Sequence, residues 1–130
     1  MIYKIIKAIE HRGFLTGSQA LWGVTEESDW DYVLETEDFE KIVNKINQIN
    51  YSYQEIKDYQ FSLTGIYFEV DGKKFNLINC TSEQYKLWYV TLQMLKQIPE
   101  DWRAITKKDQ RKQLYRGIVS ELEYLYKKDR

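Results

Sequence analysis

The chain has 130 residues, of which 43% are hydrophobic and 30% are charged, a composition that is typical of one globular domain and excludes a disordered chain. Its single cysteine excludes an internal disulfide framework and a cysteine-rich zinc site, and a reducing compartment such as the cytoplasm is expected. Its single histidine excludes a multi-histidine metal site within one chain. Carboxylates would therefore hold any divalent cation, which favours Mg²⁺ or Mn²⁺ over Zn²⁺.

The formal net charge of −1 conceals an uneven distribution. Residues 1–102 carry 10 basic and 16 acidic residues, a net charge of −6, whereas residues 103–130 carry 9 basic and 4 acidic residues, a net charge of +5. Residues 26–40 alone hold eight acids and no base. This pattern indicates either a metal site beside an anion-binding helix or two ordinary solvated faces. No apolar run approaches the roughly 20 residues needed to cross a bilayer, so no membrane partner is expected.

Hydrophobic periodicity predicts the elements of the first half of the chain. Ile2, Ile5, Ile6 and Ile9 have helical spacing and predict an amphipathic helix over residues 2–11. The other elements predicted before residue 64 are a strand over 14–16, a short helix over 18–22, a strand over 29–35, a helix over 37–49 and a strand over 59–63.

A hairpin follows in the second half. Two β-rich runs, residues 66–70 and 73–79, flank Asp71-Gly72, and an Asp-Gly pair in this setting is the strongest short-range hairpin signal. The hairpin makes the sheet at least partly antiparallel. We therefore predict the α+β class, a small mixed sheet flanked by helices, in one domain with an α/β core over residues 1–80 and a helical part over residues 81–130.

The helical part is expected to contain two long helices. Thr81 with Gln84 fits a capping box at the start of a helix over 82–97. A last helix is expected over 107–127. The residues expected to face inward from it are Leu114, Ile118, Leu122 and Leu125. Its outward basic residues include Lys107, Lys108 and Arg111, which can hold a triphosphate or a nucleic-acid backbone, or simply form a solvated face.

The segment most informative about function joins a Gly-Ser turn to an Asp-x-Asp strand. Gly17-Ser18 stands between a predicted strand and a short helix, where backbone N–H groups can bind an anion such as phosphate. Asp29 and Asp31 begin the next predicted strand. The two-residue period of a strand puts both carboxylates on one face, close enough to share one or two divalent cations. Metal-assisted phosphoryl or nucleotidyl transfer needs such a combination.

This segment resembles the core signature of the nucleotidyltransferase superfamily, which is Gly-Ser, an intervening Gly, and then Asp-x-Asp in a strand. The matching positions are Gly17, Ser18, Gly23, Ser28, Asp29 and Asp31. The resemblance implies a polymerase-beta-like fold in which Asp29 and Asp31 bind Mg²⁺ or Mn²⁺ and serve in catalysis. The residues that it implies for binding the phosphates of a nucleoside triphosphate are Gly17, Ser18 and Ser28.

The resemblance implies transfer of a nucleoside monophosphate from a nucleoside triphosphate to an acceptor hydroxyl. Minimal members of the superfamily often act on proteins, as in toxin–antitoxin pairs, and others modify small molecules or RNA, so the acceptor stays open. A homodimer or a partner protein is expected to complete so small a cleft. The alternative is a catalytically degenerate binding or regulatory protein, of the kind that a phage encodes, which acts through a protein or a nucleic acid.

One position departs from the pattern of the superfamily. Active members usually carry a third acid on a later strand, where this chain has Asn76, which adds no negative charge and is a poor general base. If Asp71-Gly72 forms a two-residue turn, Tyr67 lies opposite Asn76 and Glu69 shares the sheet face with it. Glu69 can then supply the missing carboxylate. The alternative role for Glu69 is a cross-strand ion pair with Lys74.

Overall fold

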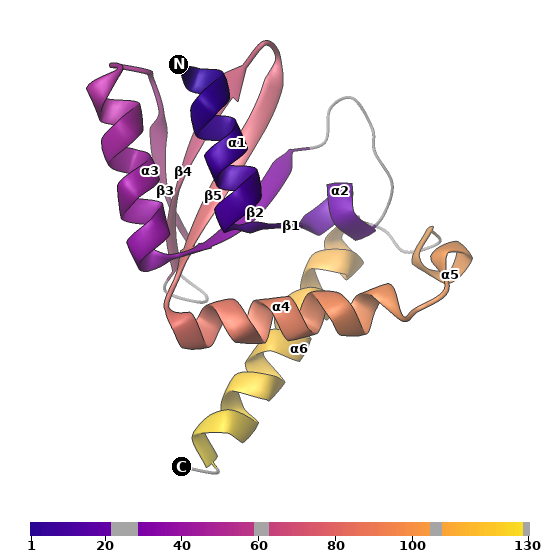
Figure 1. Ribbon diagram of the computed structural model, residues 1–130. Coiled ribbons are helices and arrows are strands. Elements are labelled where there is room, and N and C mark those ends of the chain that lie inside the picture. The colour runs from indigo at the N-terminus through magenta and orange to yellow at the C-terminus, as the bar shows by residue number, and fades with distance from the viewer. Residues whose placement is uncertain (22–28, 59–62, 105–107, 129–130) are drawn as a thin grey trace.

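The computed structural model describes residues 1–21, 29–58, 63–104 and 108–128. Its elements, in chain order (Figure 1), are α1 (Ile2–Arg12), β1 (Phe14–Thr16), α2 (Gly17–Leu21), β2 (Trp30–Glu35), α3 (Thr36–Gln48), β3 (Gln54–Asp58), β4 (Leu63–Val70), β5 (Lys73–Cys80), α4 (Ser82–Lys96), α5 (Glu100–Ala104) and α6 (Lys108–Lys128). The class is α+β, as the sequence predicts. The predicted helices form with ends within one residue of those expected.

The strands form a mixed sheet in the order β1-β2-β5-β4-β3. β2 and β5 run parallel, whereas the other neighbouring strands are antiparallel. The predicted hairpin joins β4 to β5 at Asp71 and Gly72, whose φ angles of 51° and 81° are the positive values that a two-residue type I′ turn requires. Its register sets Tyr67 opposite Asn76, as expected.

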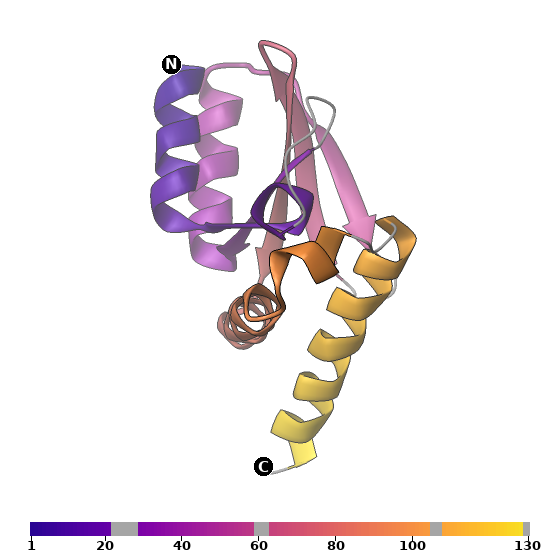
Figure 2. The same cartoon turned by 90° about the vertical axis from the view of Figure 1, so that its right-hand side faces the viewer.

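Helices α1 and α3 lie side by side on one face of the sheet (Figure 2). The helical spacing of their isoleucines turns one side of each helix toward the strands, so Ile5, Ile9, Ile42 and Ile46 are buried there. They pack in one cluster with sheet residues such as Phe68. Each buried isoleucine contributes about 1.5–3 kcal/mol of hydrophobic stabilisation relative to an exposed one.

Helices α4 and α6 cover the opposite face, at the end of the sheet away from the hairpin turn (Figure 1). The predicted capping box of Thr81 and Gln84 begins α4. Tyr115 of α6 ties this layer together, because its hydroxyl accepts a hydrogen bond from Thr16 Oγ1 (2.9 Å) and donates one to the carbonyl of Trp88 (2.8 Å). Over the described residues, no helix is long and apolar enough to cross a bilayer.

The structure tests the strand predicted over residues 59–63 only at Leu63, and the strand beside it was not predicted. Residues 59–62 lie outside the described residues, and Leu63 begins β4. The strand that pairs with β4 on its free side is β3, which was not predicted. β3 is an edge strand with the sequence QEIKD, and its one apolar residue, Ile56, is 37% exposed. Its sequence therefore lacks the alternation of apolar and polar residues that identifies a half-buried strand.

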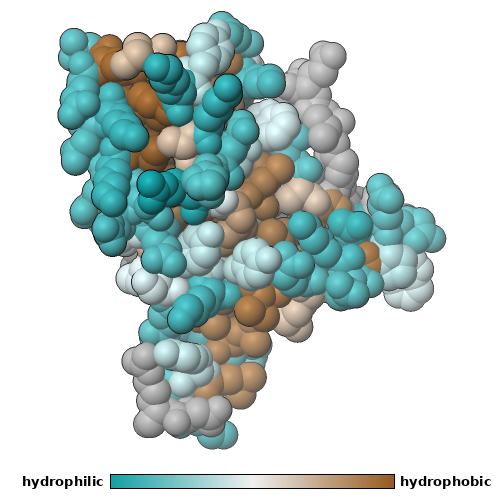
Figure 3. Space-filling view, viewed as in Figure 1, coloured by the Kyte–Doolittle hydropathy of each residue, from teal (hydrophilic) through white to brown (hydrophobic). Residues whose placement is uncertain are grey.

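The inward face predicted for α6 is partly wrong. Leu114 and Leu125 are 40% and 51% exposed, whereas Ile118 and Leu122 are partly buried. The buried residues of α6 are instead Tyr115 and Val119. The physical reason for Leu125 is that α6 crosses α4 and extends past it, which leaves hydrophobic side chains exposed on the extension (Figure 3). Leu114 instead lies beside Tyr115 in the helix, and because Tyr115 points toward α4, its neighbour, about 100° away around the helix, does not.

Candidate functional site

The two predicted carboxylates converge on one side chain. Asp29 precedes β2 and Asp31 lies within it. The amide nitrogen Nδ2 of Asn76 donates to both, to Asp29 Oδ2 over 3.0 Å and to Asp31 Oδ1 over 2.9 Å. Because one nitrogen reaches both groups, these two oxygens lie within about 6 Å of each other, the sum of the two distances. The shared face expected from Asp-x-Asp spacing is therefore confirmed.

The pairing of β2 with β5 explains why Asn76 reaches these carboxylates. The parallel register places Asp31 directly beside Asn76. In the present geometry the amide N–H groups compensate the like charges of Asp29 and Asp31. A half-turn of the amide would instead present its oxygen to a cation held by the same carboxylates.

The Gly-Ser turn lies against the second carboxylate. Gly17 begins α2, next to Thr16, and Thr16 pairs with Asp31 across β1 and β2. A Cβ atom at Gly17 would lie 2.4 Å from Asp31 Oδ2, and the φ of Gly17 is +70°. The backbone of the turn therefore approaches Asp31 at a distance that only glycine allows. Of Ser18 only the backbone is described, and Ser28 lies outside the described residues.

Glu69 does not join the two aspartates in the way the third-acid hypothesis requires. Its carboxylate Oε1 accepts a hydrogen bond from the hydroxyl of Tyr67. Among the described residues, no three acidic, histidine or cysteine side chains come together as a metal-binding group. The cross-strand pair with Lys74 is also absent: the two residues lie opposite each other, but no ion pair between them occurs within the described ranges.

Tyr67 also belongs to this polar surface. Its strand register was predicted, but no role was predicted for it. Its hydrogen bond to Glu69 raises the pKa of the phenol to about 12, with smaller contributions from burial and from the charges of Glu69 and Asp29. The contribution of Asp29 indicates that Tyr67 lies within electrostatic reach of that carboxylate. The hairpin register sets Tyr67 opposite Asn76. The place of Tyr67 on this surface could have been predicted from that register.

The position of the predicted basic side chains relative to the carboxylates lies outside what the structure describes. Lys107 lies outside the described residues. Lys108 and Arg111 belong to the first turns of α6, where the structure describes only their backbone. The anion-binding role of these residues therefore stays a prediction.

The donor set fits a hard divalent cation. Asp29 and Asp31 offer carboxylate oxygens and Asn76 offers an amide oxygen after rotation, and Mg²⁺ and Mn²⁺ prefer oxygen ligands of this kind. Mg²⁺ in particular is commonly held by one or two carboxylates, while water and substrate phosphates complete its octahedron. A third protein carboxylate is therefore not required for binding, although its absence removes a candidate general base.

Comparison with known proteins gives no family for the chain. No protein-family model matches it, and no curated protein and no solved structure matches it either. The resemblance to nucleotidyltransferases therefore rests on the sequence of residues 13–35 alone.

Proposed function

We propose that the protein is a metal-dependent nucleotidyltransferase that moves a nucleoside monophosphate from a nucleoside triphosphate to an acceptor hydroxyl. The observation that carries the proposal is the convergence of Asp29 and Asp31 on Asn76 Nδ2, at 3.0 and 2.9 Å. Two carboxylates so close together on one face are costly without a compensating positive charge. A divalent cation bound to a triphosphate supplies that charge in phosphoryl-transfer chemistry.

Each residue of the proposed site has a distinct task. Asp29 and Asp31 hold Mg²⁺ or Mn²⁺, and Gly17, Ser18 and Ser28 bind phosphate oxygens of the triphosphate. The cation supplies charge neutralisation and acidifies the acceptor hydroxyl. Gly17 keeps the turn free of a side chain where it meets Asp31, so the phosphates can approach the backbone. The polymerase-beta-like fold belongs to the same proposal, which the mixed sheet and the pairing of β2 with β5 support.

Asn76 favours a second candidate function, a degenerate site that binds a nucleotide or a metal without turnover. An amide at this position accepts no proton from the attacking hydroxyl, and Glu69 is engaged by Tyr67 rather than by the aspartates. Such a protein would act through a protein or nucleic-acid partner. The basic residues Lys107, Lys108 and Arg111 would then contact a nucleic-acid backbone.

Transfer of label from α-phosphate-labelled nucleoside triphosphates tests the first candidate. The assay uses the full chain with Mg²⁺ or Mn²⁺ and an acceptor panel of proteins, RNAs and small hydroxyl compounds. We expect Asp31→Asn to abolish transfer, and Asp101→Asn, an exposed aspartate of α5, to leave it unchanged. Transfer that survives Asp31→Asn would contradict the assigned roles.

Calorimetry separates the two candidates. Binding of nucleotide and metal to the wild-type chain, lost in Asp31→Asn and accompanied by no transfer across the panel, supports the degenerate site. If neither Mg²⁺, Mn²⁺ nor a nucleoside triphosphate binds, both candidates are wrong.

A further inference from the structure

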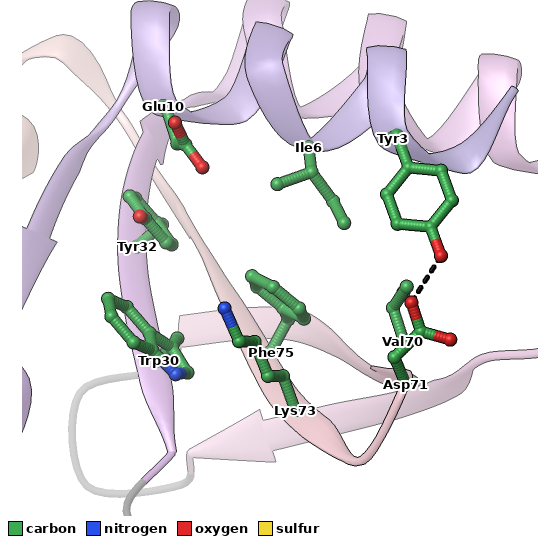
Figure 4. Close-up of a pocket in the computed structure, with 9 residues that line it drawn as sticks. All are labelled: Tyr3, Ile6, Glu10, Trp30, Tyr32, Val70, Asp71, Lys73 and Phe75. Atoms are coloured by element: carbon green, nitrogen blue, oxygen red, sulfur yellow. Dashed lines mark hydrogen bonds between the residues drawn. The ribbon is translucent and has the colours of Figure 1, made fainter.

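A recess of about 210 Å³ lies on the face of the sheet opposite Asp29 and Asp31, beneath α1 (Figure 4). The residues that line it are Tyr3, Ile6, Glu10, Trp30, Tyr32, Val70, Asp71, Lys73 and Phe75. Its floor is apolar and fixed, because Tyr32, Val70 and Phe75 are only 6%, 4% and 4% exposed. An apolar floor with a few charged groups at the rim is the usual construction of a small-molecule site.

One end of the recess is closed by a contact within the protein. The hydroxyl of Tyr3 donates a hydrogen bond to Oδ2 of Asp71 (Figure 4). This hydrogen bond raises the pKa of Tyr3, as does the charge of Asp71. The carboxylate of Asp71 therefore already has a partner, and recognition of a ligand falls to the other end.

At that other end, Glu10 and Lys73 reach toward the recess from opposite sides, one from α1 and one from β5 (Figure 4). No ion pair joins these two described residues. Instead, the Nζ atom of Lys73 stands 5.5 Å from the ring centroid of Trp30, in a cation–π contact. Glu10 is close enough to Tyr32 that its charge contributes, after burial, to the raised pKa of that phenol. A carboxylate and an ammonium thus border one aromatic recess without neutralising each other.

We propose that this recess binds a small zwitterion with a single aromatic ring, the chemical class of a free aromatic amino acid. The ammonium of the ligand pairs with Glu10, its carboxylate pairs with Lys73, and its ring packs on the aromatic floor formed by Tyr32 and Phe75. The volume limits the ligand to one ring, because sites for drug-sized ligands are usually about 300–1,000 Å³. A phosphorylated ligand fits poorly, since Glu10 and Asp71 would repel it.

This site is independent of the proposed nucleotidyl transfer, because the sheet separates the two faces. Trp30 points into the recess, while its neighbours Asp29 and Asp31 face Asn76 on the other side. Asp31→Asn should therefore leave zwitterion binding unchanged, so failure of one proposal does not affect the other.

Nuclear magnetic resonance on the full ¹⁵N-labelled chain tests the site, with L-phenylalanine as the probe. The reporter is the indole N–H signal of Trp30, assigned from its loss in Trp30→Phe. We expect this signal to shift with a Kd on the order of 1 mM, as is usual for a ligand of this size. Two matched compounds, 2-phenylethylamine and 3-phenylpropanoate, each lack one of the two charges, and we expect each to bind about threefold to tenfold more weakly.

Charge variants assign the two ends of the ligand. We expect Glu10→Gln to weaken L-phenylalanine and 2-phenylethylamine by about threefold to tenfold while sparing 3-phenylpropanoate, and Lys73→Gln to show the reverse preference. Glu55→Gln and Lys86→Gln, both at exposed positions away from the recess, serve as controls without effect. Ile6→Trp should abolish binding by filling the recess. Equal affinity for the three compounds, or no shift of the Trp30 signal at millimolar probe, would overturn the proposal.

Discussion

Gly17 and Asp31 approach each other so closely that a methyl group on Gly17 would lie 2.4 Å from Oδ2 of Asp31. The φ of Gly17, +70°, adds a conformational requirement to this steric one, since residues with a Cβ atom rarely adopt it. Two independent constraints thus act at one residue. The closeness of the turn to the carboxylate fixes where Asp31 can sit relative to α2.

The first prediction separates these two constraints. Gly17→Ala and Gly72→Ala both place alanine at a positive φ, +70° and +81°, but a Cβ atom at Gly72 meets nothing within 4 Å. Each variant should lose about 1–2 kcal/mol of unfolding free energy in urea. Only Gly17→Ala should also displace Asp31 and lower Mn²⁺ affinity by about tenfold or more in calorimetry. Equal metal affinity in the two variants would show that the close approach to Asp31 has no role in binding.

The second prediction concerns Asn76. Asn76→Asp removes the amide donor from Asp29 and Asp31 and adds a third negative charge, so the metal-free protein should lose about 1–3 kcal/mol of stability. Mg²⁺ should reverse this loss, because it binds three carboxylates more tightly than two, and its binding adds to the free energy of unfolding. Thermal unfolding with and without Mg²⁺ measures both effects. Asn79→Asp, on the same strand, is the control; an equal Mg²⁺ response there would contradict the assignment.

Local sequence pattern predicted most of the elements that the structure confirms. Apart from β3, which has no alternation of apolar and polar residues, the features that it did not predict depend on contacts between distant elements. The period of two placed Asp29 and Asp31 on one face, and the Asp-Gly turn set Tyr67 opposite Asn76. The contact of Asn76 with Asp31 depends on β2 lying parallel to β5, which no local pattern specifies. The family resemblance indicated only that Asn76 stands where a third acid is usual. The crossing of α6 over α4 and the placement of Glu10 and Lys73 around one recess are likewise tertiary, so no spacing within one element predicts them.

The third prediction concerns the exposed end of α6. Leu125 is 51% exposed, whereas Leu95 of α4 is fully buried. Leu95→Ala should therefore destabilise the chain by about 2–5 kcal/mol, and Leu125→Ala should change its stability by no more than about 0.5 kcal/mol. Urea unfolding measures both. A large loss in Leu125→Ala would mean that the extended end of α6 packs on something in solution.

The fourth prediction concerns the pH dependence of Tyr67. Its pKa in the folded chain is about 12, above the ordinary value of 10.0, chiefly because its hydroxyl donates to Glu69. A raised pKa means that the folded state holds this proton more tightly, so the stabilisation is fully present below about pH 10 and is lost as the pH rises through about 12. Phenolate absorbance, taken as the difference between wild type and Tyr67→Phe, follows this one group.

Removing the acceptor provides the check on that assignment. Glu69→Gln should return the pKa of Tyr67 toward 10.0, because the carboxylate charge and the charge-assisted hydrogen bond are both lost. Glu55→Gln, on the neighbouring strand β3, should leave it near its wild-type value. A Tyr67 pKa that does not respond to Glu69→Gln would mean that the hydrogen bond is not its cause.

The fifth prediction concerns the hydroxyl of Tyr115, which joins three elements. It accepts from Thr16 Oγ1 and donates to the carbonyl of Trp88, and burial raises its pKa. Tyr115→Phe keeps the ring but leaves the buried hydroxyl of Thr16 without its acceptor and the Trp88 carbonyl without this donor, so it should cost about 1–3 kcal/mol in urea unfolding. Tyr124→Phe, at a position 62% exposed, should cost nothing measurable. Because Thr16 adjoins Gly17, Tyr115→Phe should also weaken Mn²⁺ binding. If Tyr115→Phe left the free energy of unfolding unchanged, α6 would be held by apolar packing alone.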